Sequence, residues 1–334
     1  MAIRTRILGT GKALPSRVVT NADLAKIVET SNEWIVERTG IEERRFLEEG
    51  RTTSDLCAEA AMIACRAAEV DPTALDCIIV CTITPDSPLP ATAVTVQQKI
   101  GANCAAFDMA AACAGFIYGL SVGDAYIRSG TMKRVLVIGV EVLSRVSDMT
   151  DRNTCILFGD GAGAVILGAS EGPEDSKDRN ARGVLSTHIF ADGAQAPLLN
   201  IPNGGTTHPL TAENIGDRGQ YIKMQGKAVF THAVKNISRA SVIALEHNGY
   251  TAAEVDVVVA HQANLRILEG VANRTGLPLA KFFLNIHKYG NTSSASIPIA
   301  LDEAVRAGRI QPGQLVLMAA LGAGFSWGSA LVRM

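Results

Sequence analysis

Short apolar runs alternate with alanine-rich segments of helical periodicity along almost the whole chain. The apolar runs are strand-length and rich in Val and Ile, which is typical of strands that are buried on both faces. They predict strands over residues 77–83, 104–109, 134–142, 162–168, 255–260 and 314–320. Because helices must cover both faces of such a sheet, the alternation predicts a layered α/β fold.

Two of the intervening helices have polar residues at their expected starts. Thr53 or Ser54 can cap a helix that runs through Val70, and Asn21 can cap the segment ADLAKIV. Short polar side chains at these positions accept hydrogen bonds from the first free N–H groups of a helix.

A weak internal repeat relates the two halves of the chain. Cys113 precedes a helical pattern that ends at Gly130, and Asn291 precedes one that ends at Gly308, so both spacings are 17 residues. A comparable apolar strand, DCIIVC or DVVVAH, lies upstream of each. A duplicated fold with a pseudo-twofold axis would place Cys113 and Asn291 at matching helix starts that face each other. Chance similarity between α/β segments is the alternative explanation.

The most polar and turn-rich stretch, EGPEDSKDRNAR, occupies residues 171–182. Such a stretch is typical of a boundary between structural units. We therefore expect an N-terminal half at 1–172, which contains Cys113, and a C-terminal half at 173–334, which contains His261 and Asn291.

Composition limits the class of protein. With 334 residues, 47% of them apolar, the chain can bury a large core. Its longest apolar runs are far shorter than the ~20 residues that cross a bilayer, and its first residues lack the apolar centre of a secretory signal. We expect a cytoplasmic protein without membrane contact. The net charge of −2 disfavours a nucleic-acid binder.

The cysteines favour thiol chemistry over cross-linking. All seven lie in the first half, their number is odd, and no C-x-x-C pair occurs. This pattern indicates free thiols instead of a disulfide framework or a zinc site. Neither a metal motif nor a dinucleotide fingerprint is present in the sequence, so we expect no metal and no redox cofactor.

One cysteine stands in unusual surroundings. In FDMAAACAGF, residues 107–116, Cys113 follows a predicted strand and precedes a helix, with only small residues beside it. A helix N-terminus favours the thiolate, and small neighbours allow a substrate carbonyl to approach. The backbone N–H of Cys113 could also serve as an oxyanion-hole donor. The alternative is a small buried core residue.

Two further residues are candidates for partners of this thiol. His261 ends the buried strand VDVVVA and therefore lies at a carboxyl edge of a sheet, where α/β proteins build their sites. A core histidine bonded to backbone would look the same. Asn291 opens the Ser/Thr-rich segment NTSSAS, where it can cap a helix and also serve in a site.

Together these segments resemble β-ketoacyl-acyl-carrier-protein synthase III, a family of thiolase-fold condensing enzymes that start bacterial fatty-acid synthesis. The resemblance runs from Gly9 to Met334 through SNEWIVERTGI, AAACAGF, FGDGAGA, HQANLRI, YGNTSSAS and GAGFSWGSALVRM. It implies an α/β, thiolase-like fold, namely a duplicated five-layer αβαβα arrangement with pseudo-twofold symmetry.

The resemblance also implies an acyltransferase reaction. Cys113 matches the family nucleophile, which takes an acyl group from acyl-CoA. His261 and Asn291 match the pair that binds the thioester oxygen of malonyl-acyl carrier protein during decarboxylation. The enolate that forms then attacks the acyl-cysteine. Two fixed neutral donors would stabilise the charge that develops on this oxygen.

The matching binding residues extend along the CoA path. The family resemblance places Trp34, Arg38 and Arg152 at the adenine and phosphates, and Gly226, Phe230 and Asn264 along the pantetheine arm. The second oxyanion donor maps to the backbone N–H of Ala323, where family members commonly have glycine, so the local conformation is in question. The alternative for Trp34 is an amphipathic helix residue that faces the core.

Carrier-protein docking and starter size are further implications of the resemblance. Arg266 and Lys227 match positions at the tunnel mouth where the acidic carrier protein docks, although a solvated surface charge is the alternative for both. Leu89 matches a residue that a homodimer partner donates to the end of the acyl pocket. Leu at this position predicts short or branched starters of about two to five or six carbons.

Three other assignments remain possible from the sequence. One is a Cys-His-Asn starter enzyme of secondary metabolism, of quinolone or polyketide type. Another is a thiolase or 3-hydroxy-3-methylglutaryl-CoA synthase, but no cysteine follows Cys155, which counts against a thiolase. The last is a carrier-protein-binding scaffold without activity, which would usually have lost one of the three matching residues.

Overall fold

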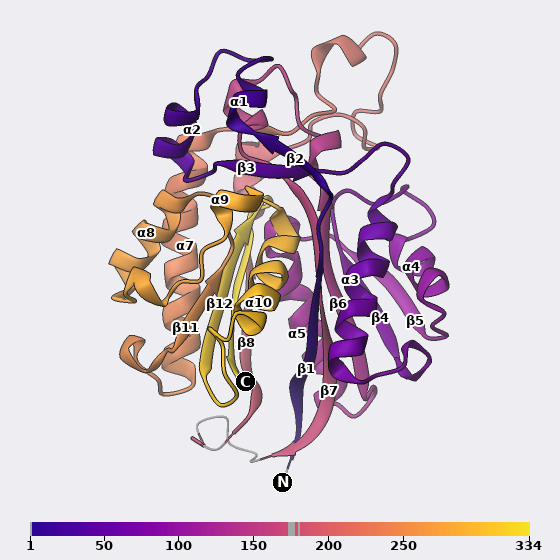
Figure 1. Cartoon of the computed structure of the whole chain (residues 1–334), viewed down its shortest axis with the longest axis vertical. Coiled ribbons are helices and arrows are strands. Elements are labelled where there is room, and N and C mark those ends of the chain that lie inside the picture. Colours follow the sequence, from indigo (N-terminus) through magenta and orange to yellow (C-terminus); the bar gives the residue numbers. More distant parts are fainter. Residues whose placement is uncertain (1, 173–177, 180) are drawn as a thin grey trace.

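The computed structural model describes residues 2–172, 178–179 and 181–334. Two sheets enclose a central pair of helices, and further helices cover the outer face of each sheet (Figure 1). The first sheet has the order β1 (Ala2–Ala13), β7 (Asp160–Gly172), β6 (Arg134–Val142), β4 (Cys77–Cys81), β5 (Ala105–Met109). The second has the order β8 (Gly183–Ala191), β13 (Ser326–Arg333), β12 (Leu315–Gly322), β11 (Val257–Ala260).

The two sheets share one topology. In the first, β4 is parallel to β6, whereas β6–β7 and β7–β1 are antiparallel. In the second, β11 is parallel to β12, whereas β12–β13 and β13–β8 are antiparallel. An isolated parallel bridge between Val258 and Phe282 takes the place that the pairing of β4 with β5 has in the first sheet. The strand order thus repeats along the chain, as the duplicated arrangement predicts.

The helices form three layers around these sheets. The central layer consists of α5 (Gly115–Arg128) and α10 (Ser296–Arg306). On the outer face of the first sheet lie α3 (Thr53–Ala68) and α4 (Thr92–Ile100), and on that of the second lie α7 (Gly226–His247) and α8 (Leu265–Thr275). Helix α3 approaches β1 so closely that a Cβ on Gly11 would lie 2.3 Å from the Ala60 carbonyl oxygen. Glycine is therefore required at this contact.

Shorter elements cover one end of both sheets. They are β2 (Arg17–Thr20), α1 (Asn21–Leu24), α2 (Asn32–Thr39), β3 (Glu43–Phe46), α6 (Arg152–Cys155), β9 (Leu199–Asn200), β10 (Lys223–Met224) and α9 (Ile286–Tyr289). Most of them gather at the upper end in Figure 1, together with a long excursion of residues 201–222.

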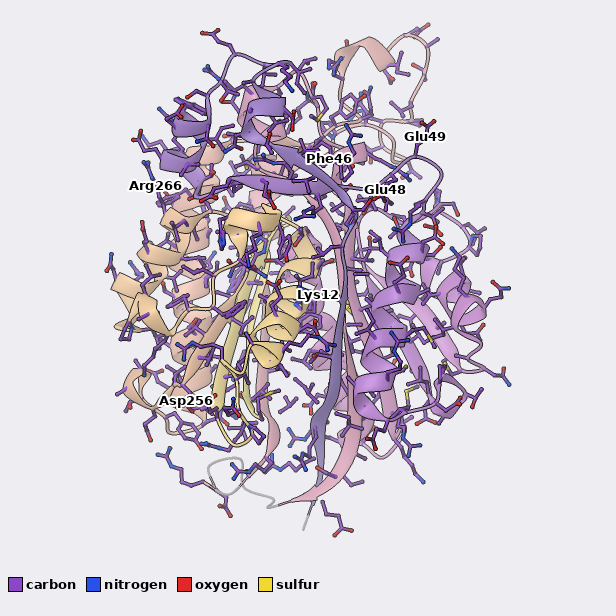
Figure 2. The ribbon with its side chains drawn as sticks, viewed as in Figure 1. Lys12, Phe46, Glu48, Glu49, Asp256 and Arg266 are labelled. Carbon is purple, nitrogen blue, oxygen red and sulfur yellow. The ribbon has the colours of Figure 1, made fainter. Side chains whose placement is uncertain are left out.

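A buried polar contact joins the two halves in the central region. Lys12 of β1, labelled near the middle of Figure 2, forms an ion pair with Glu303 of α10. Glu303 also accepts hydrogen bonds from the Tyr289 hydroxyl at 2.6 Å and from Asn285 Nδ2 at 2.9 Å. Because the Lys12 and Glu303 side chains are largely shielded from water, this contact fixes β1 against α10 more firmly than a surface pair would.

Every predicted strand is present, and β6 has the bounds expected from the sequence. Neither predicted cap is the residue that caps its helix, since each helix is capped by the residue directly before Thr53 or Asn21. Thr52 caps α3 by accepting from the Asp55 N–H, and Thr20 caps α1 by accepting from the Asp23 N–H. In each case an Asp three residues on bonds back to the cap, so the capping box decides the start.

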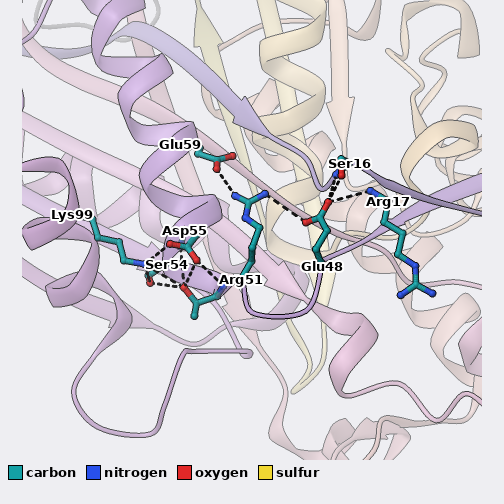
Figure 3. A network of polar contacts seen from close by, with 9 residues as sticks. Ser16, Arg17, Glu48, Arg51, Ser54, Asp55, Glu59 and Lys99 are labelled. Carbon is teal, nitrogen blue, oxygen red and sulfur yellow. Dashed lines mark hydrogen bonds and ion pairs between the residues drawn. The ribbon is translucent and has the colours of Figure 1, made fainter.

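The start of α3 belongs to a larger polar network, shown in Figure 3. Lys99 of α4 donates to Asp55 and to the Ser54 hydroxyl, while Arg51 pairs with Glu48 and Glu59. These contacts connect α3, α4 and the loop after β3 on the outer face of the first sheet.

Candidate active site

A cavity of about 680 Å³ opens where the end elements meet the carboxyl ends of the central strands. Ten of the residues singled out in the sequence line it: Trp34, Arg38, Cys113, Gly226, Lys227, Phe230, His261, Asn264, Asn291 and Ala323. They come from both halves of the chain. The structure therefore brings together side chains that are up to 289 positions apart, from Trp34 to Ala323.

Cys113 lies on a single 3-10 turn, η2 (Ala112–Ala114), between β5 and α5. The turn begins at Ala112 with φ of +45°, a left-handed conformation that is unusual for a residue with a side chain. Gly322, at the end of β12, packs against the same turn. A Cβ at Gly322 would lie 2.5 Å from Cys113 N and 3.0 Å from Ala114 N. The backbone around the thiol is thus fixed by close contact between the two halves.

The internal repeat has a different register at this point from the one predicted. The second half has an equivalent 3-10 turn, η8 (Ser293–Ala295), which begins at Ser293 with φ of +49° and leads into α10. Cys113 is the middle residue of η2, so its counterpart is Ser294, not Asn291. The equal spacing of 17 residues was misleading because α5 has 14 residues and α10 has 11.

The Cys113 thiol is buried, with 9% of the residue exposed, and this burial raises its pKa to about 12. The Ser293 side chain acts in the opposite direction by hydrogen bonding to the thiol, and the charge of Glu141 raises the pKa further. The predicted preference for the thiolate is therefore wrong. Desolvation outweighs the helix N-terminus here, so the thiol must lose its proton to a base during any reaction.

His261 directly follows β11 and is 2% exposed. Its backbone N–H donates to the Ala319 carbonyl at 2.9 Å, which continues the pairing of β11 with β12. Burial lowers the pKa of the imidazole to about 4. Its buried Nδ1 has no hydrogen-bond partner within the described part of the chain. His261 is therefore neutral near pH 7.

Asn291 is 7% exposed and is held by three hydrogen bonds. Its Oδ1 accepts from the Ser293 N–H at 2.9 Å, its N–H donates to Leu157 at 2.8 Å, and its carbonyl accepts from Gly159 at 3.0 Å. The side chain therefore holds the start of the turn through Ser293, but Thr292 and not Asn291 is the N-cap residue of η8, so the expected capping role is not observed. Because Oδ1 is occupied, Nδ2 is the group left to donate to a ligand.

Ala323 lies in the turn between β12 and β13 and faces the cavity. Among the described residues, those with positive φ include Gly324, at +130°, but not Ala323. An L-residue is therefore allowed at position 323. The Gly-to-Ala departure therefore does not force a residue with a side chain into the left-handed region.

The predicted nucleotide-binding residues cluster at the mouth. The guanidinium carbons of Arg38 and Arg152 lie 4.4 Å and 5.0 Å from the centre of the Trp34 ring. Arg152 does not line the cavity itself, and one of its Nη atoms donates to the Glu29 carbonyl. The cluster offers an aromatic plane and two cations, which suit a purine and its phosphates.

Asn264 also has a structural task. Its Oδ1 accepts from the Arg266 N–H at 2.9 Å and caps α8, while its Nδ2 donates to the Arg38 carbonyl at 3.0 Å. Its amide is thus engaged within the chain. Gly226 and Phe230, on the first turns of α7, face the same part of the cavity.

The two predicted docking cations are on the surface. Lys227 lines the mouth of the cavity. Arg266 lies at the outer edge of the molecule beside α2 (Figure 2), and its side chain is 50% exposed and 3.6 Å from Glu37. Leu89 is 85% exposed and does not line the cavity of a single chain.

Sequence reasoning missed several parts of the site. The apolar wall includes Leu143, Phe158 and Ile222, which come from three separate segments. Ser293 and Glu141 were also missed. Glu141 had a readable signal, because it is a charged residue inside the apolar run VLVIGVEV, where a buried carboxyl needs several hydrogen-bond donors.

Across residues 2–172, 178–179 and 181–334, no group of three or more His, Cys, Asp or Glu side chains is arranged to hold a metal ion. Over the same ranges, no helix has the length and apolar character needed to cross a membrane.

Comparisons with known proteins agree with the fold. Two family models match, 3-oxoacyl-[acyl-carrier-protein] synthase III at residues 107–193 and its C-terminal model at residues 245–334. The beta-ketoacyl-[acyl-carrier-protein] synthase III of Paramagnetospirillum magneticum is 51% identical over the full length of both chains. That of Bradyrhizobium sp. is 48% identical, also over both full lengths.

Solved structures of similar proteins have the same thiolase-like fold. The 3-oxoacyl-[acyl-carrier-protein] synthase III of Aquifex aeolicus is 46% identical with a TM-score of 0.89, covering 99% of this chain and 100% of its own. The priming β-ketosynthase of the R1128 polyketide pathway is 34% identical with a TM-score of 0.90, covering 100% and 98%.

Proposed function

Because the chain belongs to the 3-oxoacyl-[acyl-carrier-protein] synthase III family, we propose that it condenses an acyl-CoA starter with malonyl-acyl carrier protein. The products are 3-oxoacyl carrier protein, CO2 and CoA, and the reaction initiates type II fatty-acid biosynthesis in the cytoplasm. The observation that carries the proposal is the single cavity that holds Cys113, His261, Asn291 and Ala323. The polyketide alternative is less favoured, since its representative is 34% identical and the fatty-acid relatives reach 51%.

In the first half-reaction, Cys113 attacks the thioester carbonyl of acyl-CoA. The backbone N–H groups of Cys113 and Ala323 receive the oxyanion that forms on the carbonyl oxygen. CoA leaves, and the acyl group stays on sulfur as a thioester. The covalent intermediate holds the electrophile in place for the second substrate.

In the second half-reaction, His261 and Asn291 bind the malonyl thioester oxygen. Loss of CO2 moves an electron pair toward this oxygen, so donors that are fixed and neutral stabilise the transition state more than the ground state. Burial keeps His261 neutral, with a pKa of about 4, and Asn291 is oriented by Ser293. The enolate carbon then attacks the acyl-cysteine carbonyl and releases Cys113.

Substrate delivery follows the cavity outward. Trp34, Arg38 and Arg152 bind the CoA nucleotide, and Gly226, Phe230 and Asn264 accompany the pantetheine arm. Lys227 and Arg266 meet the acidic carrier protein at the mouth. No metal or redox cofactor takes part. The supporting observation is the aromatic and cationic cluster around Trp34.

The role of Asn291 can be tested by separating the two half-reactions. Asn291→Ala should still load an acyl group from acetyl-CoA onto Cys113, but its CO2 release from malonyl-acyl carrier protein should fall about 100-fold, because one oxyanion donor is lost. Asn248→Ala, which removes a buried asparagine outside the cavity, is the control and should retain both activities. Unchanged condensation by Asn291→Ala would overturn the assignment.

A further inference from the structure

Glu141 is a buried carboxyl to which the proposed reaction gives no role. It lies near the end of β6, and none of the residue is exposed. Its oxygens accept from the Thr82 and Thr84 hydroxyls at 3.2 and 2.7 Å, from the Ile83 N–H at 3.2 Å, and from the Ser293 hydroxyl at 3.2 Å. A cation partner for Glu141 is absent from the described ranges. Burying an unpaired carboxylate is costly, so an apolar side chain would stabilise this position better.

Ser293 hydrogen bonds to Glu141 and also to Asn291 in the active site. Its N–H donates to Asn291 Oδ1, and its hydroxyl donates to Glu141 Oε1 at 3.2 Å. Turn η8, which carries Ser293, packs against turn η2, which carries Cys113, and both side chains line the same cavity. A hydroxyl has one hydrogen and two lone pairs. While that hydrogen points to Glu141, a lone pair remains to accept the thiol hydrogen of Cys113. The groups thus form a chain from sulfur to hydroxyl to carboxylate.

We propose that Glu141 receives the Cys113 proton through the Ser293 hydroxyl when the acyl-enzyme forms, an inference that rests on the proposed function. The thiol hydrogen moves to Ser293 Oγ as the Ser293 hydrogen moves to Glu141 Oε1. The sulfur lone pair forms the bond to the acyl carbon, and the pair of the broken C–S bond leaves with CoA. The proton returns through the same hydroxyl and ends on the CoA sulfur. Glu141 is therefore a positioning residue that acts through Ser293.

The alternative proton acceptor is less suited to the task. Burial lowers the pKa of His261 to about 4, whereas burial raises the pKa of Glu141 to about 7. At a given pH, a proton is therefore held about a thousandfold more favourably by Glu141. A base with a pKa near the working pH is efficient in proton transfer. This division leaves His261 neutral for the malonyl half-reaction.

Other titratable groups around Glu141 do not compete for its proton. The thiols of Cys81 on β4 and Cys57 on α3 face it from two elements, and burial raises the pKa of both, so they stay protonated. Asp108 on β5 also acts on these thiols, but its carboxylate is held by the first N–H groups of α4 at 2.7 and 2.8 Å. Cys113 is thus the group that exchanges a proton with Glu141 through a hydroxyl.

The test measures acylation of Cys113 by acetyl-CoA, using rapid quenching and peptide mass spectrometry between pH 5.5 and 9. In the unchanged protein the rate should rise through pH ~7 as Glu141 ionises. Glu141→Gln keeps an oxygen acceptor but not the base, so acylation at pH 8 should fall about 100-fold and the rise should disappear. Ser293→Ala keeps the N–H that orients Asn291 and should show the same loss.

Two controls separate the relay from a structural effect and from the proposed function. Asp160→Asn neutralises another buried carboxyl, which holds Ser144 and Leu47, and it should keep the wild-type profile. Glu141→Gln that has been acylated by long incubation should condense with malonyl-acyl carrier protein at about the wild-type rate. If Glu141→Gln does not fold, Ser293→Ala decides. If the wild type is acylated on Cys113 and both variants show the same acylation rate and pH profile as the wild type, the relay alone is overturned. If Cys113 is not acylated even in the wild type, both proposals are overturned.

Discussion

At the scale of single residues, Gly322 packs directly against the backbone turn that carries Cys113. A Cβ there would meet Cys113 N at 2.5 Å and the Ala111 carbonyl at 3.1 Å, both backbone atoms that cannot move aside. Gly322→Ala should therefore displace the N–H that receives the oxyanion and slow acylation of Cys113 about 100-fold. The measurement is the rate of acyl-enzyme formation from acetyl-CoA.

Ala323→Gly is the matched control for this change. Ala323 does not have a positive φ, so glycine has no conformational advantage there and the substitution should change acylation by less than about threefold. We attribute the slower acylation in Gly322→Ala to its contact with the Cys113 backbone. If both variants acylate equally slowly, general loosening of the turn is the cause instead.

His261 should make stability depend on pH. Its pKa is about 4 in the folded state, below the ordinary value of 6.5, so between these values the unfolded state binds more protons. The contribution of His261 to the free energy of unfolding is therefore fully present above pH 6.5 and is lost as the pH falls toward 4. The total loss is at most ~3 kcal/mol. Urea unfolding gives this free energy for the wild type and for His261→Asn. The difference between the two proteins should be smaller at pH 4 than at pH 7, by at most ~3 kcal/mol. Parallel curves would refute a buried neutral imidazole.

Site residues could be predicted from the sequence where they lie at the end of a strand or the start of a helix. Cys113, His261 and Asn291 follow or precede recognisable strands and helices, and all three line one cavity. The direction of the Cys113 pKa was wrong because burial depends on packing between both halves, which local sequence does not reveal. Glu141 and Ser293 are 152 positions apart, so their contact could not be predicted from spacing.

At the scale of elements, an Arg–Asp contact holds the excursion of residues 201–222 over the cavity. Arg218 donates from Nε at 2.7 Å and from an Nη at 2.5 Å to Asp148, whose side chain is 4% exposed. The contact lowers the pKa of Asp148 well below its usual range. Ile201 and Ile222, at the two ends of the excursion, line the cavity. A two-point contact of this kind restricts the segment more than a single charge would.

Loss of this contact should loosen the acyl end of the cavity. Arg218→Gln should increase hydrogen exchange in residues 201–222 and raise the KM for acyl-CoA several-fold, because the buried Asp148 carboxylate loses its two-point partner and keeps only the longer ion pair with Lys223, at 3.7 Å. Arg274→Gln on α8 is a control that should leave exchange in this segment unchanged. If Arg218→Gln exchanges like the wild type, the contact does not hold the segment.

Strands were predicted well where they are apolar throughout and poorly where they alternate. The bounds of β6 could be predicted from the continuous apolar run VLVIGVEV, since every residue after Arg134 is buried. In contrast, β1 and β8 mix charged or exposed positions with buried ones, so their sequences lack a continuous apolar run. Their place in the sheets depends on pairing with β7 and β13, which are distant in the chain.

At the scale of the whole molecule, we propose that residues 1–172 and 173–334 are duplicated halves. The repeated strand order supports this division, as do the matching turns η2 and η8. The repeat could be recognised in the sequence from strands and glycines. Its register at the active site could not, because the two central helices differ in length.

We propose that a homodimer, and not a single chain, selects the starter. Leu89 is 85% exposed and far from contributing to its own cavity, which fits the proposal that a homodimer partner receives it. Leu89→Phe should then narrow the acyl pocket and favour acetyl-CoA, while Leu89→Ala should admit longer acyl groups. Competition between acyl-CoAs of different length measures this preference. A monomer by sedimentation, or unchanged preference in both variants, would contradict the shared pocket.

The central claim, that Cys113 carries the acyl group between the two substrates, is tested most directly by peptide-resolved mass spectrometry. The protein is incubated briefly with acetyl-CoA and short branched acyl-CoAs, alone and then with malonyl-acyl carrier protein. We predict one acyl adduct on Cys113 that disappears as CO2 and 3-oxoacyl carrier protein form, and the mass of the adduct identifies the starter. An unmodified Cys113 with every acyl-CoA would contradict the account.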